Sequence, residues 1–162
     1  MARAHSTSAA ILLGGFIAGT IDIGAACLIT GRDAIFILHV IAGGLIGKTA
    51  AFAGGNETAA LGLLLQWGMA ILIAAIYVLA SRAVPLLARL WIAGGLAYGI
   101  GVFFVMNYVV VPLSAYRHMP QFTPQGFAKN MAAMLLFGLI VAVFARERRA
   151  SAWARQSSIA SS

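Results

Sequence analysis

Charged residues are scarce in this chain. Only 9% of its 162 residues are Asp, Glu, Lys or Arg, and 62% are hydrophobic, whereas soluble domains usually carry about 25% charged residues. A soluble fold could not hide that much apolar surface. We therefore expect an all-α integral membrane bundle, with a single membrane domain over residues 1–150 and a short cytoplasmic tail over 151–162.

Residues that commonly carry chemistry are also scarce. Cys27 is the only cysteine, which excludes an intrachain disulfide and a thiolate metal cluster. The three histidines, His5, His39 and His118, are scattered among four acidic residues, so no metal site is expected. The sequence also lacks an HExxH pair, a GxxxxGK[ST] loop and a second intramembrane aspartate. We predict that the protein is not an enzyme and has no cofactor.

Four long apolar runs are present, at 9–29, 58–80, 90–111 and 127–145. The first run has 21 residues, and at about 1.5 Å per residue it reaches about 30 Å, the thickness of the hydrocarbon core. A secretory signal is the competing interpretation of this run, but signal cores are only about 7–15 residues long. The pattern predicts four transmembrane helices.

A shorter apolar run at 34–47 ends at Lys48. Its 14 residues suit an interfacial or re-entrant helix better than a membrane crossing. If the run continued through Lys48 to residue 54, it would become a fifth span, with only a tight turn before the next apolar run. The sequence favours four spans and leaves five as the alternative.

The basic residues indicate how the chain is oriented. They lie in short connections and near the C-terminus rather than among aromatic residues, which favours membrane orientation over nucleic-acid binding. With four spans, the side that holds both termini carries seven of them and the opposite side carries four, which predicts that both termini are cytoplasmic. With five spans, only the N-terminus would change sides. The seven are Arg3, Arg82, Arg89, Arg146, Arg148, Arg149 and Arg155, and the four are Arg32, Lys48, Arg117 and Lys129.

Glycines four residues apart occur in three of the apolar runs. Such pairs let two helices approach closely, either within one chain or between chains. Steps of three and four residues continue the first pair's stripe to Asp22 and Ala26, so Asp22 is expected to face protein rather than lipid. The pairs are Gly15 with Gly19, Gly43 with Gly47, and Gly95 with Gly99.

Asp22 is the strongest functional signal in the sequence. A charged side chain near the bilayer centre costs about 2.5–3.5 kcal/mol on insertion scales, so acids within spans are rare and often functional. Depth along the helices places His39 and Asn107 in the same outer half, with Asn130 near the start of the last span. We predict an intramembrane polar site made of these four residues. Such a site would act as a proton relay or cation site, or it would fix helix register through hydrogen bonds.

Two segments carry a family resemblance. The sequences GGFIAGTID at 14–22 and MNYVVVPLS at 106–114 resemble a group of small bacterial inner-membrane proteins of unknown function, which are loosely similar to the YagU-type proteins. The likeness extends from Gly14 to Arg146. It implies a bacterial inner membrane and a multi-span helical fold, and it supplies no catalytic residues.

Three functional hypotheses follow from these patterns. The leading one is a non-enzymatic structural or accessory membrane component that self-associates, or binds a membrane-protein partner, along its glycine-lined faces. The alternative is a small proton- or cation-coupled carrier or channel that uses Asp22. The third is a lipid-handling protein whose short apolar segment and basic cytoplasmic ends contact anionic headgroups of the bilayer.

Overall fold

Helices make up almost all of the described chain. The computed structural model describes residues 7–117 and 122–160, and none of these residues forms a strand. Four helical segments are long and apolar enough to cross a membrane, which confirms the predicted all-α fold and its four spans. They are α1 (Thr7–Thr30), α4 (Gly55–Ala83), the segment Trp91–Leu113 and the first part of α8, Pro124–Arg146.

The remaining elements are short. The segment Trp91–Leu113 consists of α6 (Trp91–Val105), a π-helical turn η1 (Met106–Val110) and α7 (Val111–Leu113). Between the first two spans lie α2 (Ala34–Ile46) and α3 (Lys48–Ala53), and α5 (Pro85–Arg89) links α4 to α6. α8 extends from Pro124 to Ala160, so the described part of the predicted tail continues the helix.

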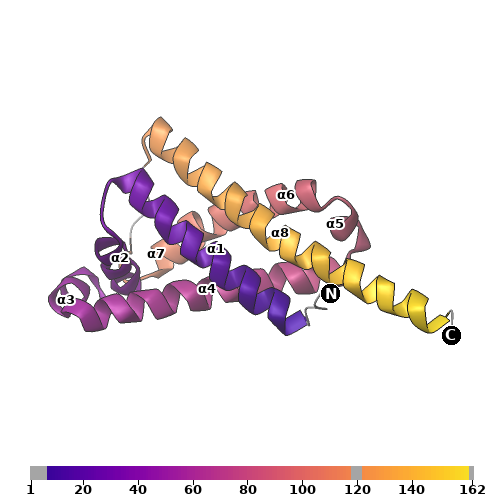
Figure 1. Ribbon diagram of the computed structural model, residues 1–162. Helices are drawn as coiled ribbons and strands as arrows, with labels where there is room; N and C mark the ends of the chain where they lie inside the picture. The colour runs from indigo at the N-terminus through magenta and orange to yellow at the C-terminus, as the bar shows by residue number, and fades with distance from the viewer. Residues whose placement is uncertain (1–6, 118–121, 161–162) are drawn as a thin grey trace.

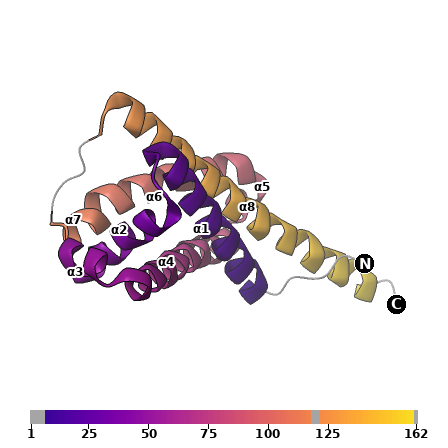
Figure 2. The ribbon, with the colours of Figure 1, turned by 60° about the vertical axis from the view of Figure 1, so that its left-hand side comes forward.

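The run after the first span does not form a fifth crossing. α2 has 13 residues, which corresponds to about 20 Å, and it packs against α3 and α4 at one end of the bundle (Figures 1 and 2). Gly47 separates α2 from α3 with a φ of +87°, a left-handed conformation that favours glycine. Gly47 therefore ends the helix. A Cβ built on Gly47 would have no other atom within 4 Å, so Gly43 and Gly47 do not form the shared packing face that their spacing predicts.

The turn between α1 and α2 is set by local signals. Gly31 has a φ of +66° and its N–H donates to the Cys27 carbonyl oxygen at 2.8 Å, an arrangement typical of a helix C-terminus. Asp33 then caps α2, because its Oδ1 accepts a hydrogen bond from the Phe36 N–H at 2.8 Å. Residues that stop one helix and start the next thus turn the chain within a few positions.

The third span contains a π-helical turn that the sequence analysis did not predict. The Val111 N–H donates to the Met106 carbonyl oxygen, five residues earlier. Pro112 follows directly and has no N–H of its own, so the regular hydrogen-bond ladder cannot continue unchanged. The helix ends at Leu113, two residues beyond the predicted boundary. Turns of this kind occur frequently at functional sites.

The spans pack through small residues. α1 lies against α4 and α8, and α6 lies along α8 (Figure 1). The main buried cluster of the described residues contains many alanines and two large aromatic rings, and the small side chains let the helix backbones approach closely. Its buried members are Ala18, Ala70, Ala74, Tyr77, Val78, Phe137, Val141, Ala142 and Ala145.

The glycine pairs of α1 and α6 are contacts within one chain. A Cβ on Gly15 would lie 2.6 Å from the Ile71 Cα, and one on Gly19 would lie 2.8 Å from the Ala70 Cβ. On α6, a Cβ on Gly95 would lie 3.0 Å from the Gly138 carbonyl oxygen, and one on Gly99 would lie 2.5 Å from the Met134 carbonyl oxygen. These faces are therefore covered by α4 and α8 of the same molecule.

The loop after the third span is hydrogen-bonded to α2. The Tyr116 hydroxyl donates to the Val40 carbonyl oxygen at 2.8 Å, and the Ala115 N–H donates to the Gly44 carbonyl oxygen, also at 2.8 Å. Gly43 leaves room for the tyrosine, since a Cβ there would lie 2.5 Å from its hydroxyl oxygen. Burial raises the pKa of Tyr116 above its ordinary value of 10.0, so the hydroxyl keeps its proton at neutral pH.

Replacing Tyr116 with phenylalanine is expected to loosen α2. The change removes one hydrogen bond worth about 1 kcal/mol, so amide hydrogens of α2 should exchange faster in mass-spectrometric hydrogen exchange. Tyr108→Phe, at an exposed position of η1, is the matched control and should leave α2 unchanged. Because the pKa of Tyr116 is raised by folding, the stability it contributes should fall as the pH rises above about 10. Equal exchange in both variants would contradict this role.

Candidate functional site

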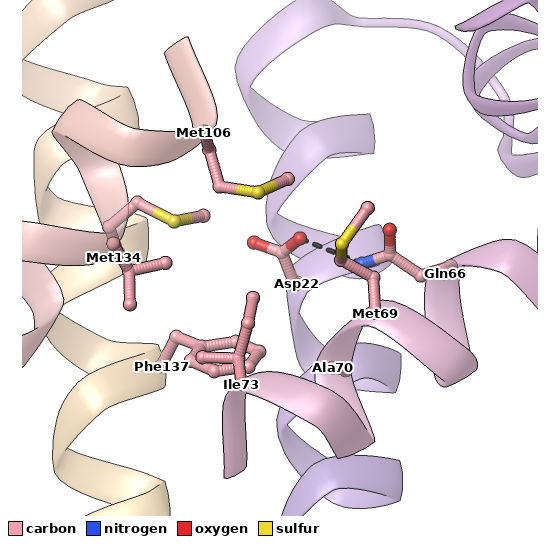
Figure 3. A pocket seen from close by; sticks show the side chains of 9 residues that line it. Asp22, Gln66, Met69, Ala70, Ile73, Met106, Met134 and Phe137 are labelled. Atoms are coloured by element: carbon pink, nitrogen blue, oxygen red, sulfur yellow. Dashed lines mark hydrogen bonds between the residues drawn. The ribbon is translucent and has the colours of Figure 1, made fainter. Parts of the chain in front are cut away.

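Asp22 lies on the side of α1 that faces α4. Its Oδ2 accepts a hydrogen bond from the Gln66 Nε2 at 2.8 Å, and the same Nε2 lies 3.5 Å from the Gly19 carbonyl oxygen. The other carboxylate oxygen points away from Gln66, toward Met106 and Met134 (Figure 3). Gln66 therefore holds one oxygen of the carboxylate and leaves the second directed into the bundle.

A small cavity adjoins this carboxylate. Its volume is about 30 Å³, whereas about 10–15 Å³ on the same kind of measure is needed for one water molecule. Each of the four spans contributes to its lining, so the cavity lies where the helices of the bundle meet. Apart from Asp22, the lining residues are Gln66, Met69, Ala70, Ile73, Val102, Met106, Met134 and Phe137.

Three methionines line the cavity together with Asp22. Met69 comes from α4, Met106 from the start of η1 and Met134 from α8, and their side chains extend toward Asp22 (Figure 3). Methionine sulfur is a soft, polarisable, weak acceptor. The cavity thus combines one carboxylate and one amide with thioether sulfurs in an otherwise apolar lining.

His39 has a different position and partner. Its Nε2 lies 2.8 Å from the Gly55 carbonyl oxygen, and since a carbonyl oxygen only accepts, Nε2 must carry the hydrogen. The ring also packs beside Phe52, with 5.3 Å between ring centres. His39 therefore ties α2 to the start of α4, and it does not line the Asp22 cavity.

Asn107 and Asn130 do not line the cavity either. The buried Asn107 donates from its Nδ2 to the Phe103 carbonyl oxygen at 2.8 Å, one turn back on its own helix. Asn130 is half-buried on α8, one turn before Met134. Of the four residues predicted to form one polar site, only Asp22 lies at the cavity, and its partner is Gln66.

A larger groove lies near the short helices. Its volume is about 560 Å³, and its lining is apolar except for Lys48 and Tyr116. The other lining residues are Phe36, Val40, Phe52 and Val111. The lipid-handling hypothesis would place an acyl chain here, with Lys48 near its headgroup.

A double-mutant cycle tests the bond between Asp22 and Gln66. Gln66→Leu is expected to destabilise the protein by about 1–2 kcal/mol, because it leaves a buried carboxylate without its donor. Adding Asp22→Leu should restore part of this loss, with a coupling energy of about 0.6–1.7 kcal/mol. The unfolding free energies of the four proteins of the cycle are measured by SDS titration in mixed micelles. Strictly additive losses would show that the two side chains do not interact.

Comparisons with known proteins do not assign this chain to a family. No family model, curated protein or solved structure matches this chain. The fold and the site define a small helical membrane protein with four spans and one carboxylate at an internal cavity. Its function has to be inferred from that cavity. Among the described residues, no group of three or more His, Cys, Asp or Glu side chains is placed to hold a metal ion.

Proposed function

We propose that this protein is a small cation carrier or channel in which the Asp22 carboxylate binds the cation. The observation that supports the proposal is the position of Asp22 at a cavity to which all four spans contribute. An uncompensated carboxylate is costly in hydrocarbon, whereas a bound cation removes the net charge. A site between all the spans is also where a small relative movement of the helices would open it to either side.

The hydrogen bonding of Asp22 favours ion binding over a purely structural role. Gln66 occupies only one carboxylate oxygen, and the other points toward the methionines rather than toward a polar group that would fix helix register (Figure 3). A carboxylate that served only to join α1 to α4 would need no cavity beside it. The cavity has room for one dehydrated ion or about two water molecules.

The accessory-component hypothesis has less support from the packing. It relied on glycine-lined faces for self-association or for a partner, and the glycines of α1 and α6 are covered by α4 and α8. A partner would have to bind the lipid-facing sides, where large apolar residues such as Leu28 and Leu72 are exposed. Contact with bilayer lipid explains those side chains equally well.

We further propose a bacterial inner membrane with both ends of the described chain on the cytoplasmic side. The start of α1 and the end of α8 lie at the same end of the bundle (Figure 1). Arg82, Arg89 and Arg146 belong to that end, and the Arg146 guanidinium carbon lies 5.1 Å from the centre of the Trp91 ring. Clustered arginines are typical of cytoplasmic ends.

The proposal is tested by ion flux into liposomes that contain the purified protein. Gradients of H⁺, Na⁺, K⁺ and Cu(I) are applied one at a time, the last under anaerobic reducing conditions, and uptake is followed with ion-specific dyes. We expect uptake of at least one cation above that of protein-free vesicles, with saturation at high concentration. If folded protein gave no uptake of any of these cations, the proposal would be wrong.

A further inference from the structure

We infer that the cation is a soft monovalent metal ion, Cu(I), bound by the sulfurs of Met69, Met106 and Met134 and the carboxylate of Asp22. This inference rests on the proposed function for the role of Asp22. It adds the chemical class of the ion, which follows from the donor atoms, the size of the cavity and the charge of the site.

The donor atoms favour a soft ion. The chain has six methionines, and three of them, each from a different helix or turn, line this one small cavity around Asp22 (Figure 3). Soft thioether ligands select Cu(I), whereas Mg²⁺, Ca²⁺ and Mn²⁺ prefer carboxylate, carbonyl and water oxygens. The side-chain oxygens of the lining come only from Asp22 and Gln66, too few for a hard cation that takes about six oxygens.

The size of the cavity also favours a soft ion. With about 30 Å³, which on the same measure is room for only about two water molecules, it can hold a bare ion but not an ion with its full hydration shell. Any ion must therefore exchange its water for side-chain donors on entering. Cu(I) can make this exchange with sulfur, whereas a hard ion would lose more in dehydration than these ligands return.

The charge of the site fits a monovalent ion. One carboxylate and one Cu(I) sum to zero, so the loaded cavity carries no net charge within the hydrocarbon. A divalent ion would leave an uncompensated positive charge there, which is strongly unfavourable. Gln66 complements this arrangement, because its amide donates to one oxygen of Asp22 and leaves the other available to the ion.

The π-helical turn contributes to the site. η1 begins at Met106, where the wider turn changes the direction of the side chains relative to a continuous α-helix. Met106 is half-buried at the cavity, and the next residue, Asn107, is fixed to the helix by its bond to Phe103. The irregular turn thus lies where the third span supplies a sulfur ligand.

The test measures Cu(I) affinity in detergent micelles by competition with the chromogenic chelator bicinchoninate, under anaerobic reducing conditions. All proteins carry Cys27→Ala, because a thiolate would itself bind Cu(I). We expect one Cu(I) per chain, and at least a tenfold weaker affinity when Met69, Met106 and Met134 are all replaced by leucine. Leucine conserves the volume of methionine, so the fold should persist.

Met131→Leu is the matched control. Met131 lies on α8, one turn before Met134, is half-buried and does not line the cavity, so its replacement should leave the affinity unchanged. Equal Cu(I) affinity in the triple variant and the control would show that the methionines only fill space, as methionine often does in cores, and would overturn the inference.

Two further measurements test the Cu(I) assignment independently of the folding of the triple variant. Copper X-ray absorption of the loaded Cys27→Ala protein should show sulfur neighbours, and a shell of only oxygen and nitrogen would overturn the inference even if the triple variant failed to fold. In the liposome experiment, uptake of Na⁺ or K⁺ without Cu(I) would overturn the assignment of the ion while leaving the proposed carrier intact. Absence of all uptake would instead contradict the proposed function.

Discussion

Replacement of Asp22 by asparagine is expected to reduce cation uptake by about a hundredfold. Asparagine has nearly the same shape, and its Oδ1 can still accept the hydrogen bond from Gln66, so the packing of α1 on α4 should persist. The negative charge is lost, however, and a cation in the cavity would then be uncompensated. The cost of about 2.5–3.5 kcal/mol for a charge at this depth corresponds to about two orders of magnitude in binding.

The matched control for this change is Asp33→Asn. Asp33 caps α2 outside the spans, and asparagine is an equally good helix cap, so this variant removes a carboxylate without changing the fold. Uptake into liposomes should remain at the wild-type level. Normal uptake by a folded Asp22→Asn protein would remove Asp22 from the mechanism, and an equal loss in both variants would indicate a general effect of net charge.

Replacement of Gly15 by leucine is expected to separate α1 from α4. A Cβ at this position would lie 2.6 Å from the Ile71 Cα, and a backbone atom cannot move aside as the tip of a side chain can. We expect a loss of about 3 kcal/mol or more in unfolding free energy, at the upper end of the usual cost of overpacking. Because Asp22 is two turns further along α1, its bond to Gln66 and the ion uptake should be lost as well.

Gly24→Leu is the control for the packing of α1. Gly24 lies on the same helix, is exposed, and would have no atom within 4 Å of a new Cβ. A leucine there would face lipid, where it is favourable. SDS titration in mixed micelles should show normal stability for Gly24→Leu and a marked loss for Gly15→Leu. Similar stabilities of the two variants would contradict the close contact of α1 with α4.

The four spans and the short helix after the first span could be predicted because each signal is local. Runs of apolar residues long enough to cross a bilayer, and a run after the first span that is too short to do so, follow from the rise per residue of a helix. The break at Gly47 was harder to predict, since a glycine in an apolar run is read equally well as a packing residue. Only its φ of +87° shows that it ends α2.

Approximate depth along the helices predicts His39 and Asn107 as neighbours of Asp22, whereas the hydrogen-bond partner of Asp22 in the structure is Gln66. His39 and Asn107 satisfy their own hydrogen bonds within α2–α4 and α6, so neither needs the carboxylate. Gln66 was visible as a polar residue in the second apolar run, eight residues from its outer end at Thr58, and Asp22 is seven from the outer end of its own run. The similar depths of Asp22 and Gln66 on two antiparallel neighbouring helices are the sequence signal that pairs them.

The methionines could not be recognised from sequence. Met69, Met106 and Met134 are far apart in the chain and look like ordinary apolar members of their spans. Their convergence depends on the rotation of three helices about their axes, and for Met106 also on the π-helical turn. Rotation is set by contacts such as that of Gly99 with Met134, which a single sequence does not specify.

Native mass spectrometry of the Cys27→Ala protein tests the central claim most directly. The protein is extracted gently from its membrane, exposed to Cu(I), Na⁺ and K⁺ together under anaerobic reducing conditions, and weighed intact. We predict that each chain retains a single cation, that this cation is copper, and that Asp22→Asn in the same background retains none. A chain that retains no cation, or an Asp22→Asn protein that retains as much as the parent, would contradict the assignment of the cavity as a cation site.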